Sequence, residues 1–325
     1  MKFLFNPSTD APFNLAFEEL IASRFDDDVI MLWRNRNAVI VGRNQNTAAE
    51  VDADFVKAHD IQVVRRMTGG GAVYHDLGNI NFTISVRDRQ LEPEAFARNA
   101  QVVLDALKSF GVAAEFSGRN DIVVDGRKIS GSAKSVLDKR TLFHGTLLFS
   151  ANLSMLTSVL TPDPEKIRSK GIKSVRSRVA NLQEFLPQWD VETFLTQLTN
   201  AMLTVSGAEF VEIPEDMVCA AEELANKKYR TWQWNYGTPI NYAYSKGKRF
   251  PFGTCRVNFN VANNCIADLH LTGDFFGVED IFALSAMLNG VSLEPESLSA
   301  AIKKIPVERF IHGATAEDII SLFDL

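Results

Sequence analysis

The chain has 325 residues, more than one typical domain needs, so two domains are expected. Hydrophobic residues make up 46% and charged residues 23%, as in globular proteins with a substantial core. A net charge of -6 argues against general binding to nucleic acid or membrane surfaces, because such partners are polyanionic. No apolar run approaches the ~20 residues that span a membrane, and the N-terminus lacks a signal-peptide pattern. Three cysteines without metal-site spacing fit a reducing compartment, so a cytoplasmic protein is expected.

The first half of the sequence predicts alternating helices and strands. Helices fit residues 12–24, 51–59 and 93–110, and short β-branched runs at 29–33, 38–42 and 63–64 predict strands. The clearest strand signal is NINFTISV (79–86), in which apolar and polar side chains alternate. Because the side-chain period of a strand is two, its apolar and polar residues are expected on opposite faces.

The second half predicts a hairpin and then a smaller module. Asp125-Gly126 lies between two strand-like runs and is a residue pair that a tight type I′ turn requires, which places Lys128 on the returning strand. A strand fits 141–149, and helices fit 192–204 and 215–227. Beyond an irregular aromatic stretch at 226–239, two strands around an Asn-Asn turn and helices near 278–289, 295–304 and 315–323 follow. We expect an α+β protein with a large mixed-sheet domain (1–242) and a small C-terminal α+β domain (243–325).

The segment RRMTGGGAVYHD (65–76) is a candidate anion site. Three consecutive glycines cost backbone entropy and usually mark a place where something approaches the main chain closely. Their N–H groups can form an anion-binding concavity, and two preceding arginines supply positive charge. The P-loop and dinucleotide patterns are both missing, and a plain connecting turn is the alternative. His75 fits a structural or substrate-contacting role better than that of a catalytic base.

A second candidate is Lys128. A lysine on a strand is usually exposed and without function, but this one runs into Ser-Gly-Ser-Ala, small residues that let a ligand lie against the strand. It follows Asn120 and Asp121, polar residues suited to a metal or a sugar hydroxyl. A third candidate is the segment 166–178, which has six cations and no acid. It predicts either a solvated loop or a mobile basic loop that closes over a phosphorylated intermediate.

Together these segments resemble the lipoate–protein ligase family. The matching pieces occur in the family's order: NLAFEE (14–19), VGRNQN (41–46), RRMTGGGAVYHDLGNINFT (65–83), GRNDIVVDGRKISGSA (118–133), HGTLLFS (144–150), KGIKSVRSRVANL (170–182) and YRTWQWNYGTP (229–239). The resemblance implies a fold shared with biotin–protein ligases, with a small C-terminal domain of the bacterial type. One departure is Thr68, where relatives often carry serine.

The resemblance also implies roles for particular residues. Lys128 matches the active-site lysine that contacts the lipoate carboxylate and the α-phosphate, and His75 matches a pocket residue near the lipoyl chain. The nucleotide and adenylate are expected at Arg66, Gly69, Gly70, Gly71, Ala72, Val73, Tyr74, Asn120, Asp121 and Lys128, with Gly71 also touching lipoate. The loop expected to rearrange over the adenylate contains Lys170, Gly171, Lys173, Arg176 and Arg178.

The implied reaction uses ATP and lipoate as substrates. Lipoate attacks the α-phosphate to form lipoyl-AMP and pyrophosphate. Mg²⁺ is expected at the phosphates from the chemistry of the nucleotide, since the sequence shows no cluster of metal ligands. The lipoyl group then passes to a lysine of a lipoyl-domain protein, such as a 2-oxoacid dehydrogenase E2 subunit or the glycine cleavage H protein. Two alternatives stay open: a non-catalytic lipoate-binding sensor, and a carrier-dependent octanoyl or lipoyl transferase that acts through a cysteine thioester. A biotin ligase is disfavoured because no arginine-glycine-rich biotin loop is present.

Overall fold

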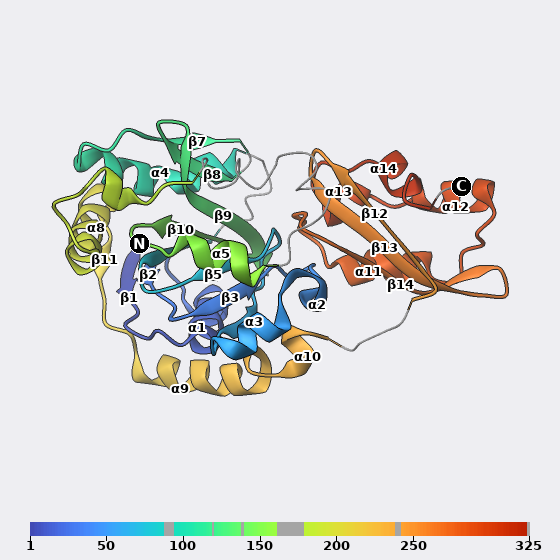
Figure 1. The fold of residues 1–325 in the computed structure, drawn as a ribbon, viewed down its shortest axis with the longest axis horizontal. Coiled ribbons are helices and arrows are strands. Elements are labelled where there is room, and N and C mark those ends of the chain that lie inside the picture. The colour runs from blue at the N-terminus through green and yellow to red at the C-terminus, as the bar shows by residue number, and fades with distance from the viewer. Residues whose placement is uncertain (88–93, 119, 138–139, 161–178, 238–241, 324–325) are drawn as a thin grey trace.

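The computed structural model describes residues 1–87, 94–118, 120–137, 140–160, 179–237 and 242–323 (Figure 1). The larger unit is built on a mixed eight-stranded sheet with the order β11-β1-β2-β6-β10-β9-β8-β7. Strand β1 is parallel to β2 and β11, whereas the neighbouring pairs from β2 to β7 are antiparallel. The strands are β1 (Lys2–Phe5), β2 (Val29–Trp33), β6 (Asn79–Val86), β7 (Ala114–Ser117), β8 (Asp121–Val124), β9 (Arg127–Leu137), β10 (Arg140–Leu148) and β11 (Glu209–Phe210).

Helices cover both faces of this sheet. On one face, α4 (Ala95–Ser109) and α8 (Val191–Ser206) share a core with Ile30 and Leu32 of β2. On the other face, α1 (Ala11–Arg24) and α9 (Glu215–Leu224) share a core with Met31 and Trp33 of the same strand. Because consecutive strand residues point to opposite faces, this division identifies the two sides of the sheet.

Strand β6 has the predicted alternation, but both of its faces are buried. Ile80, Phe82 and Ile84 lie in the α4–α8 core. The polar residues on the opposite face are at most 2% exposed: Asn79, Asn81, Thr83 and Ser85. Thr83 Oγ1 donates to Glu18 Oε1 of α1 at 2.6 Å. The polar face of β6 therefore lies inside the protein, on the side of the sheet that carries α1.

A second, three-stranded sheet lies on the same side. Its order is β4-β3-β5, with β3 (Ala38–Val41) parallel to β4 (Gln62–Arg65) and antiparallel to β5 (Val73–His75). The short helices α2 (Thr47–Glu50), α3 (Ala53–Ala58) and α5 (Leu153–Val159) accompany it. The glycine segment connects β4 to β5, so both of its ends are fixed by strands of this small sheet.

The C-terminal unit has a core of its own. Its antiparallel sheet contains β12 (Tyr244–Phe250), β13 (Gly253–Ala262) and β14 (Cys265–Gly273). The helices α11 (Ile281–Leu288), α12 (Pro295–Ile302), α13 (Val307–Phe310) and α14 (Ala316–Ile320) complete the unit. Its core cluster draws only on residues 250–323. In Figure 1 this unit lies beside the larger one, in orange and red.

The aromatic stretch before this unit is bound to β4. A 3-10 turn, Leu182–Glu184, precedes α8, and a π-helical turn, Ala225–Tyr229, leads from α9 into α10 (Trp232–Asn235). Asn235 Oδ1 accepts from the Arg65 amide at 2.9 Å, and Trp234 Nε1 donates to the Arg65 carbonyl at 2.8 Å. The stretch is therefore an ordered part of the larger unit as far as residue 237, the last described before the gap at 238–241.

The α+β class and the separate C-terminal module with a small antiparallel sheet are confirmed. The predicted hairpin forms, with Asp125 at φ 50° and Gly126 at φ 71°, and the Asn263–Asn264 turn joins β13 to β14. Strands β3 and β4 were predicted, but their pairing with β5 into a second sheet was not. Strands β5 and β12 and the shortest helices were not predicted either, because short elements carry little periodicity. The division at residue 242 stays a prediction. None of the described helices is long and apolar enough to cross a lipid bilayer.

Candidate active site

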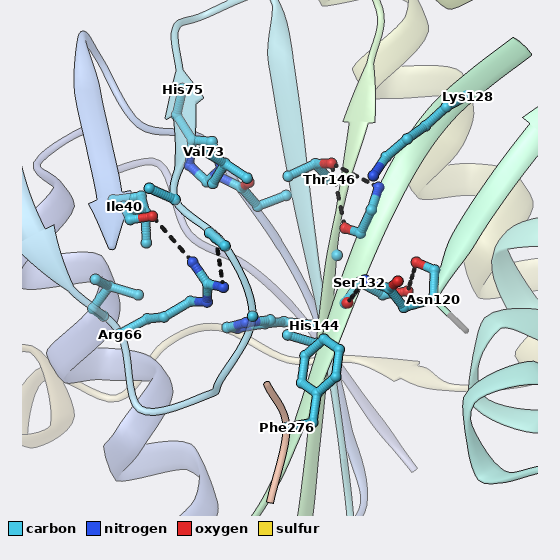
Figure 2. Close-up of a pocket in the computed structure, with 18 of the residues that line it drawn as sticks. Ile40, Arg66, Val73, His75, Asn120, Lys128, Ser132, His144, Thr146 and Phe276 are labelled. Atoms are coloured by element: carbon cyan, nitrogen blue, oxygen red, sulfur yellow. Dashed lines mark hydrogen bonds between the residues drawn. The ribbon is translucent and has the colours of Figure 1, made fainter. Parts of the chain in front are cut away.

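A pocket of about 210 Å³ lies between the glycine segment and the polar side of the large sheet (Figure 2). Its floor comes from β6, β9 and β10, and its walls from α1, β2, β3, β5 and the segment 70–73. Several residues predicted from separate parts of the sequence meet here: Arg66, Gly70, Gly71, Ala72, Val73, His75, Asn120 and Lys128. This convergence is the main geometric support for a single site.

Other predicted residues lie elsewhere. Gly69 lies in the same segment but under the carbonyl of Phe275, and Tyr74 packs in the core of the small sheet, where its hydroxyl donates to Asn37. Asp121 contacts the pocket through its ion pair with Lys128. The predicted adenylate loop, with Lys170, Gly171, Lys173, Arg176 and Arg178, lies outside the described residues.

A β-bulge orients Lys128. The pairing of β8 with β9 shifts between Ile122 and Val123, so Ile129 is an extra residue on β9. Lys128 and Gly131 are three positions apart and would point to opposite faces of a regular strand. With the bulge, both line the pocket, and a Cβ at Gly131 would lie 2.9 Å from Lys128 Nζ. Bulges commonly redirect a side chain in this way, and Lys128 Nζ also pairs with Asp121 Oδ1 at 2.7 Å.

Arg66 organises the glycine segment. Its Nη2 donates to the carbonyls of Gly69 at 2.6 Å and Gly71 at 2.9 Å, and its Nη1 donates to Ile40. In a trans peptide the N–H points opposite to the carbonyl, so the amides of Gly70 and Ala72 point away from the guanidinium. Burial lowers the pKa of Arg66 to about 10, and the side chain therefore stays charged at neutral pH. Arg66 is thus a buried cation that fixes the direction of two backbone donors.

Arg65 has a different role from its neighbour. Its guanidinium donates to the carbonyls of Gly42, Arg43, Gln45 and Trp234, and it does not line the pocket. The sequence predicted that both arginines supply positive charge to a bound anion. The structure places Arg66 at the pocket, whereas Arg65 is held by backbone carbonyls away from it.

A buried polar chain links α1 to the glycine segment, and the sequence analysis missed it. Thr68 Oγ1 accepts from Arg66 Nε at 2.9 Å, so its own proton is available to His144 Nε2 at 2.8 Å. His144 Nδ1 lies 2.9 Å from both carboxylate oxygens of Glu18. All four residues are at most 8% exposed. Glu18 and His144 belong to the quoted motifs NLAFEE and HGTLLFS, so the signal was present without an assigned role.

His75 is a neutral residue of the pocket wall. Burial, followed by the charge of Arg66, lowers its pKa to about 3. Asn35 Nδ2 lies 3.1 Å from its Nδ1, while Nε2 has no hydrogen-bond partner among the described residues. A histidine that is neutral at physiological pH and has one free ring nitrogen fits a ligand contact better than a proton acceptor with a pKa near 7.

The C-terminal unit contributes to the pocket, which the sequence did not predict. Phe276 lines it and packs edge-on against Phe96 at 5.9 Å between ring centroids. The Gly70 amide donates to the Phe275 carbonyl at 3.4 Å, and Arg43 pairs with Asp280 at 3.1 Å. Figure 2 shows Phe276 reaching toward the pocket from a segment of this unit. The pocket is therefore closed on one side by residues that follow β14.

The fold and the pocket define a class of protein with a ligand-binding site on the polar side of a mixed sheet. The polar groups of this site include a lysine and a glycine-rich segment, and its apolar walls come from α1 and the strands. The model for the lipoyl protein ligase A/B catalytic domain matches residues 10–203, and that for the bacterial lipoate protein ligase C-terminus matches residues 240–323. The chain is 37% identical to lipoate–protein ligase 1 of Staphylococcus aureus, over 99% of each chain. It is 36% identical to lipoate-protein ligase LplJ of Bacillus subtilis, again over 99% of each. The chain therefore belongs to the lipoate–protein ligase family, a family of ATP-dependent enzymes.

Solved structures agree with this family. P. falciparum LipL1 in complex with lipoate matches with a TM-score of 0.82 and 26% identity, covering 98% of this chain and 97% of that one. A lipoate-protein ligase A bound with ATP matches with a TM-score of 0.64 and 29% identity, covering 73% of this chain and 98% of the other. A bi-partite ligase from Thermoplasma acidophilum, described with its E2 lipoyl domain, matches with a TM-score of 0.66 and 31% identity over 75% and 98%.

Proposed function

We propose that this chain converts lipoate and ATP to lipoyl-AMP and pyrophosphate, and then transfers the lipoyl group to a lysine of a lipoyl-domain protein. The observation that carries the proposal is the placement of Lys128, whose Nζ lies on the pocket floor beside a glycine and within the same cavity as the segment 70–73. Relatives bound to lipoate and to ATP, and one described with an E2 lipoyl domain, support these substrates. The proposed acceptors are 2-oxoacid dehydrogenase E2 subunits and the glycine cleavage H protein, in the cytoplasm.

In the first step, a lipoate carboxylate oxygen attacks the α-phosphorus and the bond to the bridging oxygen of pyrophosphate breaks. Negative charge spreads over the phosphoryl oxygens, so catalysis is mainly positioning and electrostatic stabilisation. Lys128 Nζ would bind the carboxylate and the α-phosphate, exchanging Asp121 for these oxygens. The amides of Gly70 and Ala72, which Arg66 turns outward, would donate to phosphate oxygens.

In the second step, the acceptor amine attacks the carbonyl carbon and AMP leaves with the electron pair of the C–O bond. No enzyme nucleophile is needed. Mg²⁺ is usually held by one or two carboxylates together with the substrate phosphates. No group of three acidic, histidine or cysteine side chains suited to a metal occurs among the described residues, and Asp121 is the carboxylate that would hold it with the phosphates. When bound, the ion would neutralise phosphate charge.

The cysteine-thioester alternative has little support. No cysteine lines the pocket in the described part of the chain. Burial raises the pKa of Cys255 to about 12, so its thiolate is scarce at neutral pH. Cys219 is exposed on α9, which packs against α1 on the far side from the floor strands. The sensor alternative differs in outcome, since a sensor would bind lipoate without releasing pyrophosphate.

The test is pyrophosphate release from ATP with lipoate, measured for the wild type, Lys128→Ala and Lys128→Arg. Losing one preorganised donor costs about 10²–10³-fold in rate, and Lys128→Arg should be nearly as slow because the guanidinium is larger and differently shaped. Lys108→Ala, at the end of α4, is the control and should be normal. Near-normal release by a folded Lys128→Ala variant would contradict the role of Lys128. Absence of release by the wild type, with lipoate still bound, would favour the sensor.

A further inference from the structure

The buried polar chain between α1 and the glycine segment extends to Trp33 and has a fixed hydrogen-bond direction. Its two ends, Trp33 Nε1 and Arg66 Nε, are groups that can only donate. Trp33 Nε1 donates to Thr83 Oγ1 at 2.9 Å, and Arg66 Nε donates to Thr68 Oγ1 at 2.9 Å. Among the described residues, each threonine hydroxyl has one acceptor for its own proton, the next member of the chain. The hydrogen bonds from the two ends therefore converge on the middle of the chain.

His144 and Glu18 lie where these two directions meet. Thr68 Oγ1 donates to His144 Nε2 at 2.8 Å, which leaves the ring proton on Nδ1. Nδ1 then donates to Glu18, whose two carboxylate oxygens lie 2.9 Å away. Thr83 Oγ1 donates to the same carboxylate at 2.6 Å. Glu18 thus meets only donors, as an ionised carboxylate requires, and His144 is neutral.

The carboxylate of Glu18 is a buried negative charge without a cation beside it. Glu18 is 2% exposed, and in the described part of the chain His144 is the only basic side chain within ion-pair distance of it. A buried charge is costly unless an opposite charge compensates it. Arg66, itself 6% exposed, is the buried cation that the chain reaches. Burial lowers the pKa of Arg66, and the negative charge of Glu18 acts in the opposite direction. The two residues are therefore counter-charges joined by two neutral side chains.

The chain holds Arg66 by the one guanidinium nitrogen that backbone carbonyls do not use. Thr68 accepts from Nε, whereas Nη1 and Nη2 donate to carbonyls, Nη2 to those of Gly69 and Gly71. The guanidinium is planar and rigid, so fixing Nε fixes the directions of both Nη groups. Glu18 does not line the pocket, whereas Arg66 does. A substitution of Glu18 would therefore affect a ligand only through other side chains.

We infer that Glu18 is a positioning residue for ATP: through the chain its carboxylate fixes the orientation of Arg66, which holds the amides of the glycine segment toward the phosphates. This inference rests on the proposed function, because it takes the phosphates to lie at this segment. Glu18→Gln tests it, since the amide nitrogen is a donor where the chain needs an acceptor. Whichever way the new amide turns, one hydrogen of the chain is left without an acceptor. The affinity for ATP should then fall about five- to tenfold.

The test measures the Kd for ATP by calorimetry, without lipoate, for the wild type, Glu18→Gln, Thr68→Val and the double variant. Either substitution interrupts the same chain, so the double variant should bind ATP no more weakly than the weaker-binding single variant. Phe17→Leu is the matched control, because Phe17 is also buried on α1 but belongs to an apolar core. It should lower the free energy of unfolding and leave the Kd for ATP unchanged.

A second measurement does not depend on the folding of a Glu18 variant. Nitrogen NMR shifts of the imidazole ring distinguish its two tautomers, and the signals of His144 are those lost in His144→Gln. In the wild type, His144 should carry its proton on Nδ1, as the direction of the chain requires.

The outcomes separate the two proposals. An unchanged Kd for ATP in folded Glu18→Gln, additive losses in the double variant, or a proton on Nε2 of His144 would overturn the positioning role. ATP binding by the wild type without lipoate-dependent pyrophosphate release would overturn the proposed function, while the Kd values would still decide the role of Glu18. A loss of affinity in Glu18→Gln that Thr68→Val does not enlarge, with Phe17→Leu normal, supports that role.

Discussion

Adjacent glycines of the 69–71 segment are glycine for different reasons. Gly70 has φ +91°, and a Cβ there would lie 3.0 Å from the Phe276 ring. At Gly69 a Cβ would lie 2.5 Å from the Phe275 carbonyl oxygen. At Gly71, by contrast, a Cβ would meet nothing within 4 Å. The protein itself therefore explains the first two glycines, whereas Gly71 has open space that a ligand can occupy.

Substitution separates these reasons. Gly71→Ala should keep or slightly raise the free energy of unfolding, by about 0.4–1 kcal/mol, because it restricts only the unfolded chain. It should nevertheless raise the KM for ATP, since the methyl group would occupy the ligand's space. Gly70→Ala, the comparison variant, should lose stability through its strained φ. Urea unfolding and steady-state kinetics measure both quantities, and an unchanged KM in Gly71→Ala would show that no ligand approaches this residue.

His75 also makes a prediction about pH and stability. Its pKa is about 3 in the folded protein, against an ordinary value of 6.5. Between these values the unfolded chain binds a proton that the folded protein does not, so stability falls as the pH falls below 6.5. From pH 7 to pH 5 the loss attributable to this ring is about 2 kcal/mol. In urea unfolding of His75→Gln, the free energy of unfolding should fall by that much less between pH 7 and pH 5 than in the wild type. His312→Gln, in which the replaced residue is exposed, should behave like the wild type.

At the scale of elements, turns were predictable and the bulge was not. The residue types of Asp125-Gly126 predict the positive φ angles of this turn. The bulge at Ile129 has no such signature, since it depends on pairing with β8. The sequence therefore placed Lys128 on the correct strand, but only the bulge accounts for its face. The same limit applied to β6, where alternation predicted two faces without telling that the polar face is buried against α1.

The polar chain from Glu18 to Arg66 predicts that two substitutions of Thr68 differ in their effects on stability and on the KM for ATP. Thr68→Val removes the hydroxyl that contacts both Arg66 and His144, and should cost about 1–3 kcal/mol of stability. It should also raise the KM for ATP, because Arg66 would no longer hold the glycine segment in one position. Thr68→Ser keeps the hydroxyl and should restore KM. If the serine variant is as impaired as the valine variant, the effect comes from packing of the threonine methyl group and not from the hydrogen bonds of the polar chain.

At the scale of the whole molecule, the separate cores were predictable and their contact was not. Periodicity reveals strands and helices of each unit, but the docking of Phe275 and Phe276 onto the glycine segment joins residues some 200 positions apart, as the Gly70–Phe275 hydrogen bond illustrates. No local pattern encodes such a contact. Motifs from one unit could therefore locate most of the pocket, but they omitted the wall that the other unit supplies.

The separate cores predict local loss of stability. Leu284 is fully buried in the C-terminal core, and Leu284→Ala should cost about 2–5 kcal/mol there. Hydrogen exchange followed by mass spectrometry should show faster exchange in residues 244–323 and unchanged exchange in β6 and β10. Leu198→Ala, equally buried in the core of the larger unit, is the reciprocal variant. Equal acceleration throughout the chain by Leu284→Ala would contradict the predicted division near residue 242.

The hydrogen bond from the Gly70 amide to the Phe275 carbonyl has a thermodynamic consequence. One N–H group cannot donate fully to a phosphate oxygen and to that carbonyl at once. Any ligand that accepts from the Gly70 amide therefore competes with docking of the 275–276 segment. The docked segment lowers the affinity for that ligand by the same factor by which the ligand weakens docking. Such coupling is reciprocal by necessity. The fraction of molecules in which the 275–276 segment is docked should therefore fall as a ligand that accepts from the Gly70 amide accumulates.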